Sequence, residues 1–376
     1  MLRRLRHIIR KEFIQVLRDK KLRLFIFLPP IIQLIAYGYA INFDIKHVPT
    51  AIYDQDHSAE SRRLISRFAS SDSFALKHFI STEAELRRLI DDNRVTMAVR
   101  IPYDFARLLK SSQTAPVQVI VDATDSNAAL IVGRYAMNVI ADFSLEVMQE
   151  RLARLGAVQG LNVPVTVETR AWFNANLSSR YSFVPGVIAM VVMLVSLMLT
   201  ALAVVREKEI GTMEQILVSP IRPVEFMLGK TIPFIAISLL DMVLVILVGV
   251  FWFEVPLRGS LLVLFLGAIT FLFNSVGLGL FISTVSSTQQ QAMMAGTFFF
   301  TPAILLSGLI FPIPNMPLFF QYLTYLNPLR YFVVVVQGIF LRGDGLAILW
   351  PQMAGMTVLG LTLLALSVLR FRQRLA

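Results

Sequence analysis

The stretch REKEIGTMEQILVSP, from Arg206 to Pro220, decides the fold. It stands between two apolar runs, each long enough to cross a membrane. Its charged residues come first, and Ile210, Met213 and Leu217 then follow at spacings that place them on one face of a helix. The terminal proline ends this pattern because proline cannot continue the helical hydrogen-bond ladder. A solvated loop is the alternative, but it would not need an apolar face. The stretch predicts a short amphipathic helix between two membrane spans.

The composition of the whole chain agrees with membrane spans. Apolar residues make up 56% of the 376 residues and charged residues only 16%, against about 45–50% and about 25% in soluble domains. The apolar runs predict six transmembrane helices, at residues 22–41, 184–205, 231–253, 260–283, 292–311 and 348–369. We expect the first to be a retained anchor, because no small-residue cleavage site follows it.

The basic residues gather beside the predicted spans. The formal net charge is +10, yet the first 23 residues hold nine Lys and Arg against two acidic residues, and three Arg follow Leu369. Four more Lys and Arg lie in residues 206–230. This distribution follows the positive-inside rule and not the footprint of a nucleic-acid-binding protein. It predicts that both termini and the 206–220 helix are cytoplasmic, and that membrane lipid, not nucleic acid, is the partner of the basic ends.

The long segment between the first two spans, residues 42–183, is predicted to be an extracytoplasmic α/β domain. Its strand-like runs are Thr50–Tyr53, Phe74–Ile80, Val95–Ile101, Val117–Val121 and Val163–Val167. Helix-like runs alternate with them, at Ala59–Phe68, Glu83–Ile90 and Tyr103–Lys110, and a long helix follows over Asn127–Leu155.

Two further segments are amphipathic and do not span the membrane. Within residues 1–21, Leu5, Ile8, Ile9, Phe13, Val16 and Leu17 share one helical face opposite Arg and Lys, as in a helix on the membrane surface. Tyr331–Leu341 would reach only about 16 Å as a helix, roughly half of the hydrocarbon thickness. We expect residues 312–347 to form a re-entrant segment between the fifth and sixth spans.

Several kinds of chemistry are absent or weakly supported. The chain has no cysteine. Gly229-Lys230-Thr231 is not a phosphate-binding loop, because Val224 stands where the motif requires glycine. Asp54, Asp56 and His57 are candidate metal ligands, but a solvated turn with a helix cap nearby is the preferred interpretation. We therefore expect no catalytic, cofactor or metal site in this chain.

Three stretches resemble the ABC-2 type permeases, the membrane subunits of bacterial ABC exporters. REKEIGTMEQILVSPIRPVEFMLGK resembles the coupling segment of that family, and RKEFIQVLRDKKLRLFIFLPP resembles its surface helix and first span. SGLIFPIPNMPLFFQYLTYLNPLRYF resembles its re-entrant region, in which Asn327, Pro328, Arg330 and Tyr331 are the candidate residues. The match covers nearly the whole chain. The large domain after the first span resembles the multidrug-export branch.

The resemblance implies a transport subunit that is not itself an enzyme and that lies in the bacterial inner membrane. ATP and Mg would be bound by separate ABC ATPase subunits, and a second copy or a related permease would complete the transporter. A periplasmic adaptor is a further partner that the resemblance leaves open. The residues expected to touch the ATPase are Glu207, Lys208, Glu209, Gly211, Thr212 and Glu214.

The substrate path is predicted between two permease copies, along the second and fifth spans. Methionine and phenylalanine suit adaptable apolar surfaces, and the candidate lining residues are Met190, Met193, Met294 and Phe298. The alternative function is a secondary multidrug or cation/proton antiporter, in which Asp241 of the third span would relay protons. Asp241 could equally be a packing residue bonded to a Ser or Thr. A receptor is disfavoured, because one span would suffice to anchor it.

Overall fold

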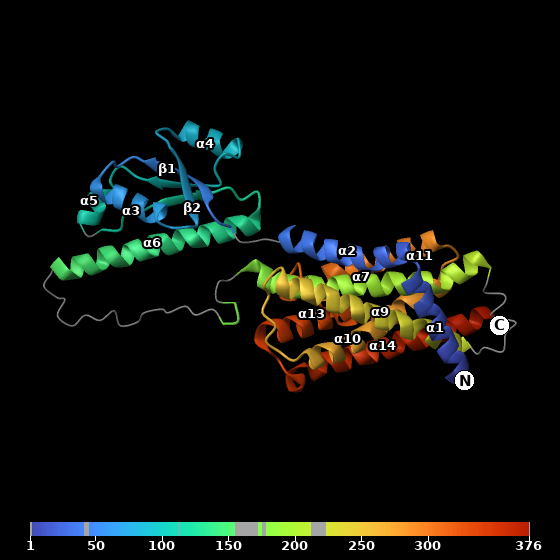
Figure 1. Ribbon diagram of the computed structural model, residues 1–376. Coiled ribbons are helices and arrows are strands. Elements are labelled where there is room, and N and C mark those ends of the chain that lie inside the picture. The colour runs from blue at the N-terminus through green and yellow to red at the C-terminus, as the bar shows by residue number, and fades with distance from the viewer. Residues whose placement is uncertain are drawn as a thin grey trace. The chain divides into compact units, whose positions relative to one another are not determined.

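The chain forms two compact units in a computed structural model, which describes residues 2–40, 45–111, 113–154, 172–174, 178–211 and 223–375 (Figure 1). The smaller unit comprises Phe43–Thr169. The larger unit comprises Met1–Asn42 together with Arg170–Ala376. Each unit has its own hydrophobic core.

The smaller unit contains a four-stranded mixed sheet with the strand order β2-β1-β3-β4. The strands are β1 (Val48–Asp54), β2 (Phe74–Phe79), β3 (Met97–Ile101) and β4 (Gln118–Val121). β1 lies parallel to both of its neighbours, whereas β3 and β4 are antiparallel. These four strands were predicted from the sequence and are confirmed, while the fifth, Val163–Val167, lies outside the described residues.

Helices cover both faces of the sheet. They are α3 (Ala59–Ala69), α4 (Glu83–Asp91), α5 (Phe105–Lys110) and α6 (Ser126–Arg154), and all four were predicted. Val132, Ala136 and Phe143 of α6 share one core with α3, α5 and the sheet. Leu86 and Leu89 of α4 belong to a second core, which Ala51, Tyr53 and Ala98 of the strands also enter. The predicted α/β architecture of this unit is therefore confirmed.

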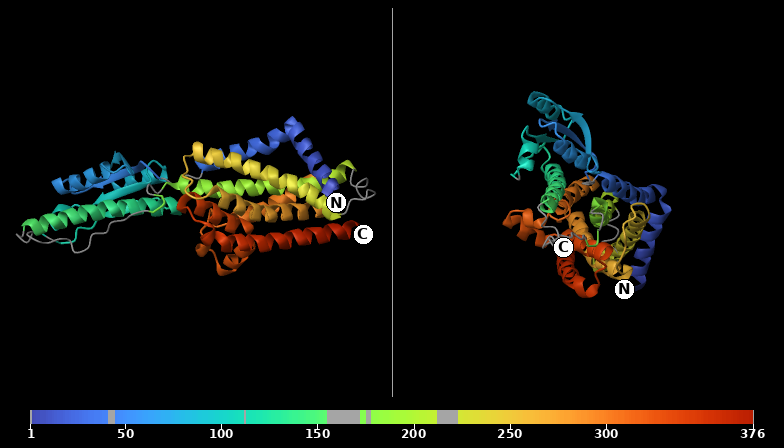
Figure 2. Two further views of the ribbon diagram at one scale, coloured as in Figure 1. Left: turned by 60° about the horizontal axis from the view of Figure 1, so that its bottom comes forward. Right: turned by 90° about the vertical axis from the view of Figure 1, so that its left-hand side faces the viewer.

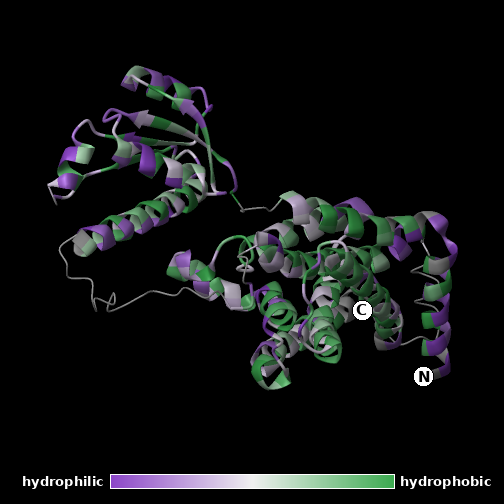
Figure 3. Cartoon of the chain, turned by 60° about the vertical axis from the view of Figure 1, so that its left-hand side comes forward, coloured by the Kyte–Doolittle hydropathy of each residue, from purple (hydrophilic) through white to green (hydrophobic). Residues whose placement is uncertain are grey.

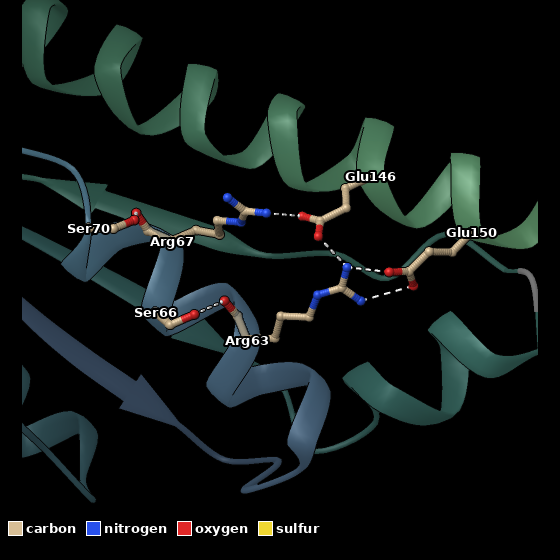
Figure 4. Close-up of polar contacts among 6 residues, drawn as sticks. All are labelled: Arg63, Ser66, Arg67, Ser70, Glu146 and Glu150. Carbon is tan, nitrogen blue, oxygen red and sulfur yellow. Dashed lines mark hydrogen bonds and ion pairs between the residues drawn. The ribbon is translucent and has the colours of Figure 1, made fainter.

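An ion-pair cluster joins α3 to α6 (Figure 4). Arg63 binds both Glu146 and Glu150, with 2.9 Å between its Nη1 and Glu150 Oε2, and Arg67 Nη2 lies 2.7 Å from Glu146 Oε2. Hydrogen bonds from Arg63 to Glu150 and Glu146 raise the pKa of its guanidinium above the ordinary value. Because the pairing is bidentate and shared, it specifies how α6 lies against α3.

The larger unit is helical. Its long helices are α1 (Leu2–Arg18), α2 (Lys20–Ala40), α7 (Ser179–Ile210), α9 (Pro223–Phe251), α10 (Leu261–Val285), α11 (Gln289–Leu305) and α14 (Leu346–Leu375). Shorter elements connect α11 to α14, namely η1 (Ile313–Asn315), α12 (Leu318–Leu323), η2 (Thr324–Leu326), α13 (Pro328–Gln337) and η3 (Gly338–Arg342). A helix therefore stands at each of the six segments that were predicted to span the membrane.

Five helices in the described part of the chain are long and apolar enough to span a membrane. Four of them lie in the larger unit, in α7, α9, α10 and α14. The fifth is Ala128–Arg151 of α6, which packs on the sheet of the smaller unit. The apolar part of α2, Ile26–Ala40, and the 17 residues of α11 are shorter. Length and composition thus support several membrane helices without specifying the predicted set of six.

Several helix termini lie together at one end of the helical unit (Figures 1 and 2). The start of α1, the end of α14, the end of α7 and the start of α9 all lie at the same end of this unit. α1 turns sharply away from α2 and alternates hydrophilic and hydrophobic residues along its length, whereas the helices beside it are mainly hydrophobic (Figures 2 and 3). A helix of mixed hydropathy therefore stands where the amphipathic N-terminal helix was predicted, and its position on the cytoplasmic membrane surface stays a prediction.

Candidate functional site

The predicted coupling stretch begins inside a long helix. Arg206–Ile210 form the last turns of α7 and are not the start of a separate helix, which corrects the prediction for these residues. The helix continues because the charged side chains find partners beside it, described below. Gly211 ends α7 in a left-handed conformation with φ 81°, which favours glycine. Thr212 and Glu214, with the rest of residues 212–222, lie outside the described residues.

Lys208 caps the end of α10. Its Nζ donates hydrogen bonds to the carbonyl oxygens of Ser283, Thr284 and Ser286, at 3.1, 3.2 and 3.2 Å. The last carbonyl groups of a helix lack partners within the helix, and a cation there also complements the helix dipole. A residue that was predicted to face the ATPase therefore also ties α7 to α10.

Glu209 caps the start of α11, as Lys208 caps the end of α10. Its Oε1 accepts a hydrogen bond from the backbone N–H of Gln289 at 2.7 Å, and its Oε2 accepts one from the side-chain amide of Gln289. A carboxylate is favourable at a helix N-terminus for the same electrostatic reasons. Glu209 is also solvent-exposed. Lys208 and Glu209 together fasten the end of α7 to the connection between α10 and α11.

Glu207 lies in a buried charge cluster that the sequence analysis missed. Lys230 Nζ of α9 donates a hydrogen bond to Glu207 Oε1 at 2.7 Å. The same ammonium lies 2.7 Å from Glu12 Oε1 of α1, as an ion pair without hydrogen-bond geometry. Lys11 Nζ completes the cluster, 3.1 Å from Glu207 Oε1. Four charges from α1, α7 and α9 therefore meet at one point.

A signal for this cluster was present in the sequence. Glu12 follows Leu5 by seven residues, so it lies on the apolar face of the amphipathic helix, where a charge needs a partner. Lys230 was considered only as part of a phosphate-binding motif. The structure buries both side chains. A charge on an apolar face was thus the observation that pointed to an ion pair.

The predicted path residues divide into two groups. Met190 and Met193 of α7 are 5% and 1% exposed and belong to the main core of the helical unit. In this structure both side chains are covered by their own chain, and their place along the substrate path stays a prediction. Met294 and Phe298 of α11 are 68% and 72% exposed.

The exposed face of α11 is hollowed. A shallow groove of about 750 Å³ runs along it. It is lined by Gln290, Met293, Met294, Thr297, Phe298, Thr301 and Pro302. The hydroxyl groups of Thr297 and Thr301 donate hydrogen bonds to backbone carbonyl groups one turn earlier in α11. The exposed face of α11 therefore presents mainly carbon and sulfur.

Asp241 is fully buried in α9. Among the described residues neither carboxylate oxygen has a hydrogen-bond partner, and the hydroxyl of Ser238, three residues earlier, has none either. The expected bond to a neighbouring Ser or Thr is therefore not formed. The alternative role for Asp241, in a proton relay, stays a hypothesis.

The NPLRY stretch, residues 327–331, makes several hydrogen bonds at the start of α13. The side-chain oxygen of Asn327 caps α13 by accepting from Leu329 N–H at 3.1 Å, and its amide donates to the carbonyl of Ala303 in α11 at 2.7 Å. Arg330 lies over the ring of Tyr325 at 3.9 Å, and Tyr331 Oη donates to the carbonyl of Tyr325. Pro328 occupies the first turn of the helix, where its missing N–H costs nothing.

α13 itself packs among the other helices. Leu329, Phe332, Val333, Val335 and Val336 are buried, and Phe332 stacks on Phe271 of α10. Its 10 residues extend only about 15 Å. Helical backbone continues through η3 to Arg342, and the combined run is still shorter than the roughly 20 residues of a membrane span. The re-entrant segment stays a prediction.

The candidate metal ligands after β1, Asp54, Asp56 and His57, form a turn. Asp54 Oδ1 accepts hydrogen bonds from the backbone N–H groups of Asp56 and His57, and its Oδ2 accepts one from Ser61. Ser58 caps α3 directly after this turn. The preferred interpretation, a turn with a helix cap nearby, is confirmed.

Comparison with known proteins defines the family. A family profile described as ABC-2 family transporter protein matches residues 20–369. "Probable multidrug ABC transporter permease YbhR" of Escherichia coli is 34% identical over 374 residues, 100% of both chains. "Probable multidrug ABC transporter permease YbhS" of the same organism is 32% identical, over 99% of this chain and 98% of its own. "ABC transporter G family member 20" of Dictyostelium discoideum is 22% identical over 90% of this chain and 46% of its own.

The chain therefore belongs to the ABC-2 family of transporter proteins. It is a permease subunit of an ABC exporter and a multi-pass membrane protein, as the sequence analysis expected. The same relatives support a transport subunit in place of an enzyme. Membership of this family implies ATPase partners, which handle ATP, and pairing with a second permease.

Proposed function

We propose that this chain forms one half of an ATP-driven exporter that moves hydrophobic or amphipathic compounds outward across a bacterial inner membrane. The relatives named as multidrug permeases support the substrate class. The observation that carries the proposal is the attachment of Lys208 and Glu209 to the connection between α10 and α11. Through it, a push by the ATPase at the end of α7 reaches α11, whose far side carries the exposed groove.

Replacement of Glu209 tests this transmission. In Glu209→Lys the cation would stand at the N-terminus of α11, where the helix dipole disfavours it by about 1 kcal/mol. We expect ATP hydrolysis to continue while export per assembled complex falls several-fold. Glu209→Gln is the matched control, because it keeps an acceptor for Gln289 N–H. Normal export by Glu209→Lys in a normally assembled complex would overturn the proposed coupling.

The proposed topology has six spans, α2, α7, α9, α10, α11 and α14, with both termini cytoplasmic. The start of α1 and the end of α14 lie at the same end of the helical unit, which supports an even number of membrane crossings (Figure 2). α6 is not counted, because its apolar residues enter the core of the α/β unit and its carboxylates bind Arg63. The α/β unit would then be periplasmic, where an adaptor protein is one partner it would meet, and α13 would belong to a re-entrant segment.

Reporter fusions test the topology. A reporter fused after Asp344 should read as outside the cytoplasm, and one fused after Arg374 as inside. The opposite result for the first fusion would remove both the re-entrant segment and the count of six spans.

The proposed path follows the groove on α11, at the interface with the second permease. Met294 and Phe298 are the predicted lining residues that this structure leaves exposed, so they are the ones to test first. Single cysteines at Met294 and Phe298 should crosslink between protomers, and bulky thiol labels there should block export. Met193→Cys is the matched control, because its buried side chain should resist labelling. An active complex without these crosslinks, whose export survives labelling, would place the path elsewhere.

A further inference from the structure

The buried charge cluster raises a question of its own. Lys230 is 3% exposed, Glu12 is 3% exposed and Glu207 is 7% exposed. Taking such groups out of water is unfavourable, and an apolar contact of similar size would join the helices without that cost. What ion pairs add is a defined geometry, because a buried ammonium must stay within reach of both carboxylates. The cluster therefore suits the task of holding three elements in one register.

A second contact shows how closely α1 lies against α9. Gly229 precedes Lys230, and a Cβ atom at residue 229 would lie 2.5 Å from Ile8 Cγ2 and 2.9 Å from Ile8 Cβ. Ile8 thus rests directly on the backbone of α9, with no side chain between. Glu12 follows Ile8 by one helical turn, so the apolar contact and the ion pair to Lys230 act on the same face of α1.

We propose that Lys230 is a positioning residue that locks α1, the end of α7 and the start of α9 into one rigid block. The block moves as a whole when the ATPase acts on any part of it. This inference rests on the proposed function, because it concerns how the ATPase stroke enters the membrane helices. It predicts that α1 does not slide along the membrane surface independently of α9 during the transport cycle.

A disulfide lock tests the rigid block. The chain has no cysteine of its own, so the double variant Ile8→Cys/Gly229→Cys carries the only pair. The two Cβ positions are 2.9 Å apart, closer than the roughly 3.5–4.5 Å of a disulfide, so α1 and α9 must move slightly apart for the bond to form. We expect rapid oxidation, seen as resistance to alkylation. ATP-driven export per complex should stay within about twofold of the reduced protein.

Loss of export on formation of the disulfide would contradict the inference. If oxidation abolishes export and a reducing agent restores it, α1 and α9 must separate during the cycle and the inference is wrong. Each single-cysteine variant, treated with the same oxidant, controls for effects of the oxidant itself. An absence of ATP-driven export in the untreated wild-type complex would instead count against the proposed function, so the two failures are distinguishable.

The same disulfide tests the role of Lys230. In Lys230→Met, the two buried carboxylates keep only the half-exposed Lys11 as a cation beside them, and we expect export per complex to fall at least tenfold while ATP hydrolysis continues. In the triple variant Ile8→Cys/Gly229→Cys/Lys230→Met, oxidation should restore most of the lost export, and reduction should remove it again. A purely structural defect or a direct contact of Lys230 with the ATPase would not respond to this switch. Failure of the formed disulfide to restore export would overturn the positioning role.

If Lys230→Met does not assemble, the disulfide in Ile8→Cys/Gly229→Cys, which keeps Lys230, still shows whether the block is rigid. The variant Glu12→Gln/Glu207→Gln/Lys230→Met provides a second route, because it leaves no charged side chain at the three buried positions. It should assemble better than Lys230→Met alone. An equal loss of assembly in both variants would contradict the view that the loss of the buried cation beside the two carboxylates is the defect.

Discussion

Asp241 offers the sharpest test of how the membrane helices are stabilised. Its side chain is fully buried in α9, and neither oxygen has a hydrogen-bond partner among the described residues. A buried polar group without a partner costs about 1–3 kcal/mol, whereas an apolar group of similar shape costs little. We therefore expect Asp241→Val to raise the free energy of unfolding by about 1–3 kcal/mol, with export unchanged.

The assay is thermal unfolding of the detergent-purified complex beside ATP-driven export in vesicles. Asp241→Asn is the charge-only control, and Ser238→Ala should also be neutral or stabilising, because its hydroxyl is buried without a partner. A lower unfolding temperature for Asp241→Val would show that the buried carboxyl group stabilises the helices after all. Loss of export in both Asp241 variants, with normal assembly, would favour the antiporter alternative, in which this carboxylate carries protons.

Three further substitutions test contacts that connect the elements. Lys208→Met removes the cation from the end of α10 and should lower stability by about 1 kcal/mol, measured by thermal unfolding against Lys208→Arg, which keeps the charge. Asn327→Ala removes the cap of α13 and the bond to Ala303, so we expect a loss of about 1–2 kcal/mol; Asn327→Asp should recover the cap alone, and an equal loss in both would contradict a capping role. Arg63→Met should speed hydrogen exchange in α6 more than in β1, whereas unchanged exchange in α6 would show that the ion pairs do not hold that helix.

The α/β unit was predictable from the sequence because its signals are local. Each strand and helix shows its own periodicity, and Ser58 and Thr82 stand as caps directly before α3 and α4. The membrane helices were also predictable, since a long apolar run needs no distant partner to be recognised. Their ends were less so: α9 begins at Pro223 and not at residue 231, and α7 continues to Ile210.

The contacts of the coupling region could not be predicted, because they join residues far apart in the chain. Nothing near Glu209 in the sequence indicates that its carboxylate meets Gln289. The burial of Met190 and Met193 was missed for a related reason. Apolar residues occur on every side of a membrane helix, so the sequence does not reveal which side faces a neighbouring helix and which faces outward.

The central claim is that ATP hydrolysis by a partner subunit, and not an ion gradient, drives this permease. The most direct measurement is export of a hydrophobic dye by vesicles that contain the permease and its ATPase, with ATP supplied and the proton gradient collapsed by an ionophore. Export should continue under these conditions and should stop when ATP is withheld. Export that stops with the ionophore, and that a proton gradient sustains without ATP, would contradict an ATP-driven mechanism.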